Sequence, residues 1–309
     1  MCDTAFVTPK LRAWVLVLMV TALCGASVWG VVWYRSRTIT PAAMLRRMPA
    51  RDAVVLYVDF RELRRGGILQ LLDGSKVGED PEYRAFVQQT EFDYKQDLDA
   101  ALVAFAPAGK FMLVRGHFEW ATLRAYVAAQ EGRCNNTFCK VTGSTPDRHI
   151  SFFPVQSNLM ALAVSSDDSA ALRMNETAPG PDPEIPNAPI WLSIPPSIMK
   201  SGQKLPDGTH MFASGLERAE AATLAVVPEG KRYAAKLNVR CSTDADAVQV
   251  RSDLAAATAT LHKMIVLDRQ TPDAFATFLS SGTFSNEGRR VYGYWPIELA
   301  FVQTMLAGS

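Results

Sequence analysis

The sequence lacks the motifs by which most enzymes and nucleic-acid-binding proteins are recognised. It has four histidines, no H-E-x-x-H and no G-x-S-x-G, so it indicates neither a zinc-protease pair nor a hydrolase nucleophile elbow. The net charge is only +1, and a nucleic-acid-binding protein needs clustered Lys and Arg to neutralise phosphates. We therefore predict no nucleic-acid partner, no cofactor and no catalytic or metal-ligating residue. The chain is more readily explained as a non-enzyme.

One long apolar run stands out near the N-terminus. Residues 13–33 contain no charged side chain, and about 21 residues of helix would span roughly 31 Å, close to the hydrocarbon thickness of a bilayer. Trp14 lies at one end of the run, with Trp33 and Tyr34 at the other, where aromatic side chains favour the membrane interface. We predict a single-pass transmembrane helix over 13–34, whose partner is the lipid bilayer.

Two alternatives exist for the same run, and its orientation is ambiguous. Cys24-Gly25-Ala26 is a passable signal-peptidase site, and Cys24 is a poorer candidate for a lipoprotein cysteine. Arginines after the run outnumber the basic residues before it, which by the positive-inside rule favours a cytoplasmic C-terminal domain. A short N-terminal tail and a candidate disulfide favour export instead. We expect an uncleaved signal-anchor in a bacterial inner membrane, with the globular domain extracytoplasmic.

The sharpest local feature is a pair of cysteines, Cys134 and Cys139, that brackets a predicted tight hairpin. Such pairs often form disulfides in oxidising compartments, and we predict a disulfide here. Free thiols are the second interpretation. A metal site is the weakest, because C-x4-C without a second pair supplies too few ligands.

The rest of the sequence predicts an α+β fold with mainly antiparallel sheets, built as a tandem repeat. We expect strands over 53–60, 98–106, 111–115, 149–155 and 159–164, and again over 189–194, 222–227, 233–240 and 290–295. Helices are expected over 61–72, 118–130 and 244–265, after Ser165 or Ser166, from Thr271, and over 296–306. In the strand from Tyr233, odd-numbered residues should point inward and even-numbered ones outward.

The repeat is suggested by two turns of matching sequence, Pro107–Lys110 and Pro228–Lys231, which follow strands at corresponding places. Glycine in each turn would supply a positive φ. A proline-rich stretch, 179–189, is the best boundary between repeats because dense proline excludes helix and interior strand. The predicted organisation is an N-terminal tail over 1–12, the transmembrane helix over 13–34, a basic juxtamembrane linker over 35–52, a first α+β unit over 53–178, the connector over 179–189 and a second α+β unit over 190–309.

The segment from Met48 to Phe60, following an apolar run, resembles the opening of uncharacterised bacterial single-pass membrane-anchored proteins. The resemblance covers only the anchor and the first strand, and it implies a topology without an activity. From these observations we expect a membrane-anchored, non-enzymatic binding or envelope-associated protein with a protein partner in the envelope. The alternative is an enzyme whose noncanonical site lies between the two units and uses His149, His210 or aspartates. A third interpretation is a structural spacer or assembly subunit with an exposed apolar patch.

Overall fold

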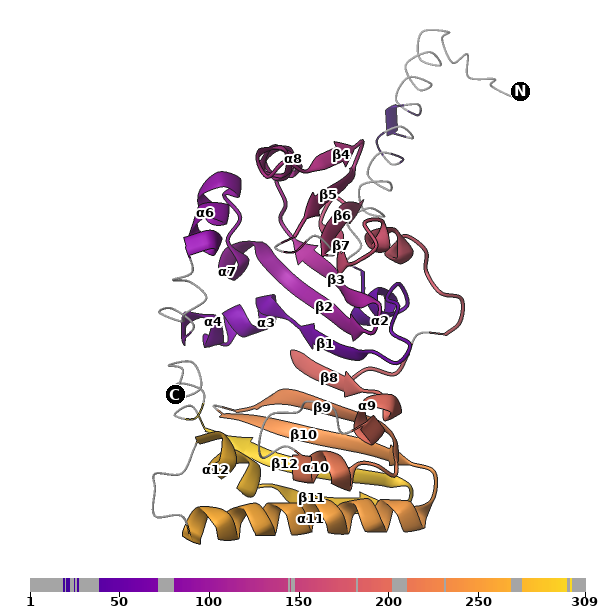
Figure 1. Ribbon diagram of the computed structural model, residues 1–309, viewed down its shortest axis with the longest axis vertical. Helices are drawn as coiled ribbons and strands as arrows, with labels where there is room; N and C mark the ends of the chain where they lie inside the picture. The colour runs from indigo at the N-terminus through magenta and orange to yellow at the C-terminus, as the bar shows by residue number, and fades with distance from the viewer. Residues whose placement is uncertain are drawn as a thin grey trace, which may run out of the picture. The chain divides into compact units, whose positions relative to one another are not determined.

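A single large antiparallel sheet organises the protein (Figure 1). The computed structural model describes Met19, Thr21, Ala22, Gly25, Ser27 and residues 39–71, 81–143, 145, 148–181, 183–201, 210–230, 232–267, 274–298 and 301. From Pro41 onward the chain forms one compact unit. Its sheet has 12 strands in the order β11-β12-β10-β9-β8-β1-β2-β3-β7-β6-β5-β4.

The strands come from both halves of the sequence. Those of the N-terminal half are β1 (Val54–Val58), β2 (Leu98–Ala106), β3 (Gly109–Gly116), β4 (Arg133–Asn135), β5 (Phe138–Thr142), β6 (His149–Gln156) and β7 (Leu159–Ser165). Those of the C-terminal half are β8 (Ile190–Ile194), β9 (Ala219–Glu229), β10 (Arg232–Cys241), β11 (Thr283–Glu287) and β12 (Arg290–Ile297).

Short helices surround the N-terminal strands, and one long helix accompanies the C-terminal strands. The first group is α2 (Pro41–Leu45), α3 (Phe60–Arg65), α4 (Ile68–Leu71), α6 (Pro81–Thr90), α7 (Tyr94–Asp97), α8 (Trp120–Ala129) and the 3-10 helix η1 (Ala170–Met174). The second is α9 (Pro196–Ser201), α10 (His210–Gly215), α11 (Asp244–Leu267) and α12 (Ala274–Ser280).

The predicted fold class needs a first correction, because the two predicted units share one sheet. Strand β8, which follows the proline-rich connector, pairs antiparallel with β1 through Leu56–Leu192 and its neighbours. The Asp59 amide also donates to the Pro189 carbonyl at 2.7 Å. The connector therefore leads the chain back to the first strand. Counted outward from this junction, the N-terminal half has the strand order β1-β2-β3-β7-β6 and the C-terminal half has the order β8-β9-β10-β12-β11. The two halves therefore arrange their successive strands in the same order.

The second correction concerns the membrane. Within the residues that the structure describes, no helix is both long enough and apolar enough to cross a bilayer. The predicted transmembrane helix over 13–34 is therefore not supported. Most of that span, together with the tail over 1–12, lies outside the described residues. Further along, the predicted linker contributes α2, whose Met44 is fully buried, while Arg46 and Arg47 donate to the carbonyls of Ala178 and Asn175.

Other predicted elements can be checked directly. Strand β10 alternates as expected, with Leu237 and Val239 buried and Asn238 and Arg240 exposed. The predicted helix over 296–306 is wrong at its start, because β12 continues to Ile297, which pairs with Tyr233. The helix expected after Ser165 is the short η1. Strand β11 was not predicted at all.

The sheet has two faces, and its two halves bury opposite ones. We call the face that carries Leu56 and Leu237 face A, and the opposite one face B. In the C-terminal half the core lies on face A, under α11, whose Val250 and Leu254 join the same cluster as Leu237. In the N-terminal half the larger part of the core lies on face B, where η1 packs on β6 and β7 and α2 contacts β2, and a smaller cluster of Val127, Cys139 and Phe152 lies under α8 on face A. The fully buried side chains on face B are Leu102, Ala104, Phe111, Leu113, Ala161 and Ala163.

Candidate binding surface

Face A of the N-terminal half carries a row of apolar side chains that are partly exposed to solvent. Cross-strand partners point to the same side of a sheet, so the row can be followed through the register. It runs Leu56–Val103–Met112–Leu162 across β1, β2, β3 and β7. In the other direction Leu56 pairs with Leu192, and the row continues to Leu237 under α11. One row is thus covered at one end and open at the other.

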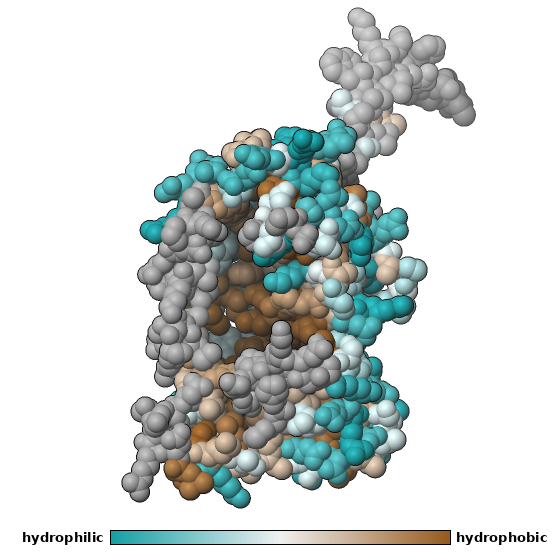
Figure 2. All heavy atoms as spheres, in the orientation of Figure 1, coloured by the Kyte–Doolittle hydropathy of each residue, from teal (hydrophilic) through white to brown (hydrophobic). Residues whose placement is uncertain are grey.

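The rows on either side are apolar too, and together they form what we call the open apolar patch. Its members are Leu56, Val58, Ala101, Val103, Phe105, Met112, Val114, Met160, Leu162 and Val164, all partly exposed or exposed. Phe105 is 42% exposed. Figure 2 shows a recessed apolar area over the part of the sheet where Figure 1 labels β1, β2 and β3. Contiguous exposed apolar surface of this kind marks an interaction site.

Among the described residues, the neighbouring helices of this half lie beside the patch and reach only its edge. Helix α8 packs on β4 and β5, where its Val127 contacts a cluster with Cys139 and Phe152. Met160 and Leu162 reach the edge of this cluster. Helix α3 contacts β2, where Arg61 binds Asp99 with two hydrogen bonds of 3.3 and 2.8 Å. By contrast, helices α9 and α11 both contact β9 in the C-terminal half.

The predicted cysteine pair lies at the far end of the same row. Leu162 pairs with Phe152, Phe152 with Cys139 and Cys139 with Cys134 across the β4–β5 hairpin. The structure joins Cys134 and Cys139 by a disulfide, so the pairing expected from the sequence is present. Cys139 is 1% exposed beneath α8. The disulfide therefore fixes the hairpin that supports this end of the sheet.

A cavity at the junction of the two halves bears on the enzyme alternative. About 520 Å³ in volume, it is lined by Tyr57, Asp59, Glu62 and Trp191 among others. Asp59 caps α3 by accepting from the Glu62 amide at 2.9 Å, and it accepts from the Tyr57 hydroxyl at 3.3 Å. Burial, followed by the charge of Asp59, raises the pKa of Tyr57 to about 12. Both groups thus serve the fold, and the Tyr57 hydroxyl keeps its proton near neutral pH.

His149 is not among the described residues that line this cavity. His149 lies in β6 and lines a different cavity beside Lys140 and Asp168. His210 begins α10 in the other half.

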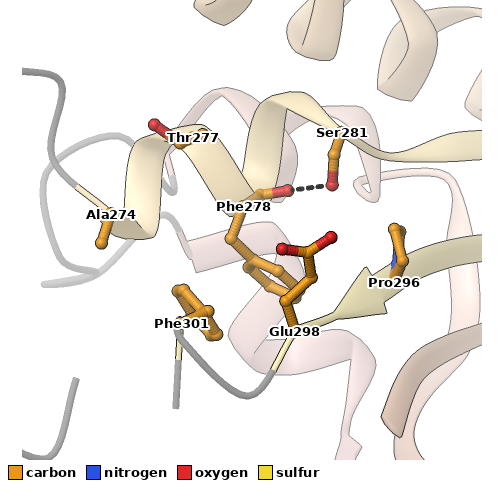
Figure 3. Close-up of a pocket in the computed structure, with 7 residues that line it drawn as sticks. All are labelled: Ala274, Thr277, Phe278, Ser281, Pro296, Glu298 and Phe301. Carbon is orange, nitrogen blue, oxygen red and sulfur yellow. Dashed lines mark hydrogen bonds between the residues drawn. The ribbon is translucent and has the colours of Figure 1, made fainter. Parts of the chain in front are cut away.

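A third cavity lies beside α12, near the end of the described chain (Figure 3). It has a volume of about 340 Å³, and Phe278, Pro296, Glu298 and Phe301 are among its lining residues. The rings of Phe278 and Phe301 stack with centroids 4.7 Å apart. The Ser281 hydroxyl donates to the Phe278 carbonyl at 2.7 Å (Figure 3), so its proton is already engaged. This arrangement is an apolar recess with one carboxylate, Glu298.

Comparison with known proteins adds a distant likeness of fold. No protein-family model matches the chain, and no curated protein does. Among solved structures, crystal form I of TP0453 matches with a TM-score of 0.48 and 14% identity, over 88% of this chain and 98% of that chain. Crystal form IV of TP0453 matches with a TM-score of 0.44 and 11% identity, over 87% and 96%. Likenesses this distant assign neither a family nor a function.

The open apolar patch was not predicted from the sequence, although a signal for it exists. Strands β2 and β3 are apolar on both faces, which is typical of strands covered from both sides. Only the ten-residue α8 follows them along the chain before the next strands begin. A sheet face with more apolar surface than the nearby helices can cover is the pattern that would have indicated a partner.

Proposed function

We propose that this protein is a non-enzymatic binding protein of an oxidising, extracytoplasmic compartment, and that it holds an amphipathic helix of a partner protein on the open apolar patch. The observation that carries the proposal is the row from Leu56 to Leu162, whose apolar side chains are all partly exposed to solvent. The Cys134–Cys139 disulfide supports the compartment, because structural disulfides persist where the environment is oxidising.

The dimensions of the patch favour a helix as its occupant. Four strands spaced about 4.8 Å apart span about 14 Å, which accommodates one helix of about 10 Å diameter. The protein itself supplies the precedent, since the same row of face A is buried under α11 at Leu237. The patch is broad and shallow, whereas a small apolar ligand prefers a concave pocket that encloses most of its surface.

Charge around the patch is sparse. Lys110 is the exposed ionic residue within its register, paired across the strands with Phe105 and Val164. A partner helix with an apolar stripe and an acidic residue near one end would therefore match it. Apolar burial of about 25 cal/mol per Å² would provide most of the binding free energy.

Site-specific photo-crosslinking in the cells that make the protein tests this proposal. A photoreactive amino acid at Met112 should crosslink to one defined protein, and the crosslinked peptide should have helical apolar periodicity. The same amino acid at Tyr292, which is 37% exposed on face B, should not capture that protein. Crosslinks to lipid, to a second copy of this chain, or to the same protein from both positions would refute the proposal.

A further inference from the structure

A polar cavity lies on face B of the C-terminal half, on the side of the sheet away from α11. It has a volume of about 380 Å³ and is bounded by the proline-rich connector at Glu184–Pro186 and by strands β8, β9, β10 and β12. The small side chains of Ala221 and Ala225 line it and leave room above the sheet. The cavity is thus separate from the open apolar patch, which lies on face A of the other half.

Two arginines meet inside this cavity. Arg240 of β10 and Arg290 of β12 are direct cross-strand partners, so their side chains leave the sheet on the same face. Like charges placed directly opposite one another destabilise a strand pair. An anion between them would relieve that repulsion.

Glu220, Glu184 and Glu287, which is the cross-strand partner of Arg290 in β11, lie beside these arginines without a short hydrogen bond to them. Arg240 Nε lies 3.6 Å from a Glu220 oxygen, and an Arg290 terminal nitrogen lies 3.9 Å from a Glu184 oxygen. Both distances exceed those of charge-assisted hydrogen bonds, about 2.7–2.9 Å. The Glu184 side chain is 84% exposed, so its hold on Arg290 is weak. Guanidinium donors therefore remain available to a ligand.

A row of neutral polar side chains runs beside the arginines. Ser193, Thr223 and Asn238 are consecutive cross-strand partners, and all three line the cavity. Among the described residues, no side-chain hydrogen bond holds any of the three. Each carries both donor and acceptor capacity, which suits the hydroxyl groups of a ligand.

We propose that this cavity binds a phosphorylated polyol, with its phosphate between Arg240 and Arg290 and its hydroxyl groups along Ser193, Thr223 and Asn238. A tetrahedral phosphate offers enough oxygens to accept from two guanidinium groups at once, whereas one guanidinium already satisfies a carboxylate. The volume exceeds what phosphate alone would fill. The same chemistry occurs in a free sugar phosphate and in the headgroup of a phosphoglycerolipid.

Isothermal titration of the full chain with inorganic phosphate, glucose and glucose 6-phosphate tests the proposal. Glucose 6-phosphate should bind most tightly, and Arg240→Gln and Arg290→Gln should each weaken it about tenfold. Glu184→Gln should strengthen binding by removing a competing carboxylate. Arg218→Gln is the matched control, because Arg218 pairs with Asp246 at 3.5 Å away from the cavity, and it should leave binding unchanged.

A second measurement separates the two sources of the ligand. If phosphatidylglycerol vesicles bind the chain in an Arg240-dependent manner while glucose 6-phosphate does not, the ligand is a lipid headgroup. No binding of phosphate, glucose 6-phosphate or vesicles would overturn the proposal. Equal losses in the Arg240, Arg290 and Arg218 variants would overturn it as well. Circular dichroism of each variant shows that the fold is retained.

Discussion

Met112 and Leu113 are neighbours in β3 that face opposite environments. Leu113 is fully buried between Leu102 and Ala161 on face B, whereas Met112 is partly exposed on the open apolar patch. Leu113 belongs to the core that stabilises the N-terminal half, whereas Met112 belongs to the patch to which we assign binding. Most of the buried core of that half lies on face B, so Met112 on the patch contributes less to folding than Leu113 does.

This separation predicts a large difference between two adjacent substitutions. Leu113→Ala should lower the free energy of unfolding by about 2–5 kcal/mol, because it leaves a cavity in the core. Met112→Ala should cost less than about 1 kcal/mol, because the side chain already contacts solvent. Urea denaturation of both variants provides the measurement. Equal losses would mean that the patch belongs to a core of the folded chain.

The ion pair between Arg61 of α3 and Asp99 of β2 should contribute more to the free energy of unfolding than an exposed ion pair does. Arg61 binds Asp99 through two hydrogen bonds, and Asp99 is 8% exposed. Arg61→Gln should lower the free energy of unfolding by about 1–3 kcal/mol, because it strands a mostly buried carboxylate. Arg65→Gln is the control in the same helix, since its exposed pair with Glu62 spans 3.7 Å. The control should change stability by less than about 1 kcal/mol, and a larger loss there than at Arg61 would contradict the account.

Ionisation of Tyr57 should make the free energy of unfolding depend on pH in the alkaline range. Burial, with the nearby charge of Asp59, raises its pKa to about 12 in the folded protein. Its stabilising contribution is therefore complete below about pH 10, the pKa of an unperturbed tyrosine. It is lost as the pH rises from 10 towards 12, because the unfolded state ionises first.

Tyr57→Phe should therefore flatten the fall in stability across that window by about 2 kcal/mol. Urea denaturation at pH 9, 10.5 and 11.5 measures how steeply the free energy of unfolding falls with pH in the parent and in the variant. The substitution retains an aromatic ring to stack on Trp191, whose ring centroid lies 5.5 Å from that of Tyr57. Identical slopes for the variant and the parent would show that Tyr57 ionises normally.

Reduction of the disulfide should destabilise the protein without unfolding it. Cys134 and Cys139 enclose four residues, and loop-closure entropy for so short a loop amounts to about 2 kcal/mol. A background of Cys2→Ser and Cys24→Ser removes the two cysteines that precede Pro41 in the sequence. Dithiothreitol should then lower the free energy of unfolding by that amount. A chain that also carries Cys134→Ala and Cys139→Ala should not respond to the reductant.

Local patterns in the sequence predicted much of the secondary structure. The turns of the β2–β3 and β9–β10 hairpins lie where the repeated proline-glycine sequence placed them, with positive φ at Gly109 and Gly230. The predicted alternation of buried and exposed residues in β10 was correct from Leu237 to Arg240. Leu237 and Val239 pack in the same cluster as residues of α11, whereas Asn238 and Arg240 lie on the opposite face. Strand β11 escaped prediction because Phe284 is its one apolar side chain among polar neighbours.

Long-range relationships could not be predicted in the same way. The pairing of β1 with β8 joins strands more than 130 residues apart, and no local pattern encodes it. The position of α8 over β4 and β5, which leaves Met112 open, depends on packing across the sheet. The opposed arginines Arg240 and Arg290 become neighbours only through the register of β10 and β12. Both candidate sites therefore arise from register and helix placement.

The most direct test of the account is the accessibility of position 112 inside and outside the cell. In a background of Cys2→Ser and Cys24→Ser, Met112→Cys should react rapidly with a maleimide in the purified chain, because the patch is open. Cys241 should stay unreactive, since burial raises the pKa of its thiol. In intact cells the same cysteine should be protected by the partner helix, whereas Tyr292→Cys should react in both settings. Rapid labelling of Met112→Cys in cells would contradict the proposal that a partner covers the patch.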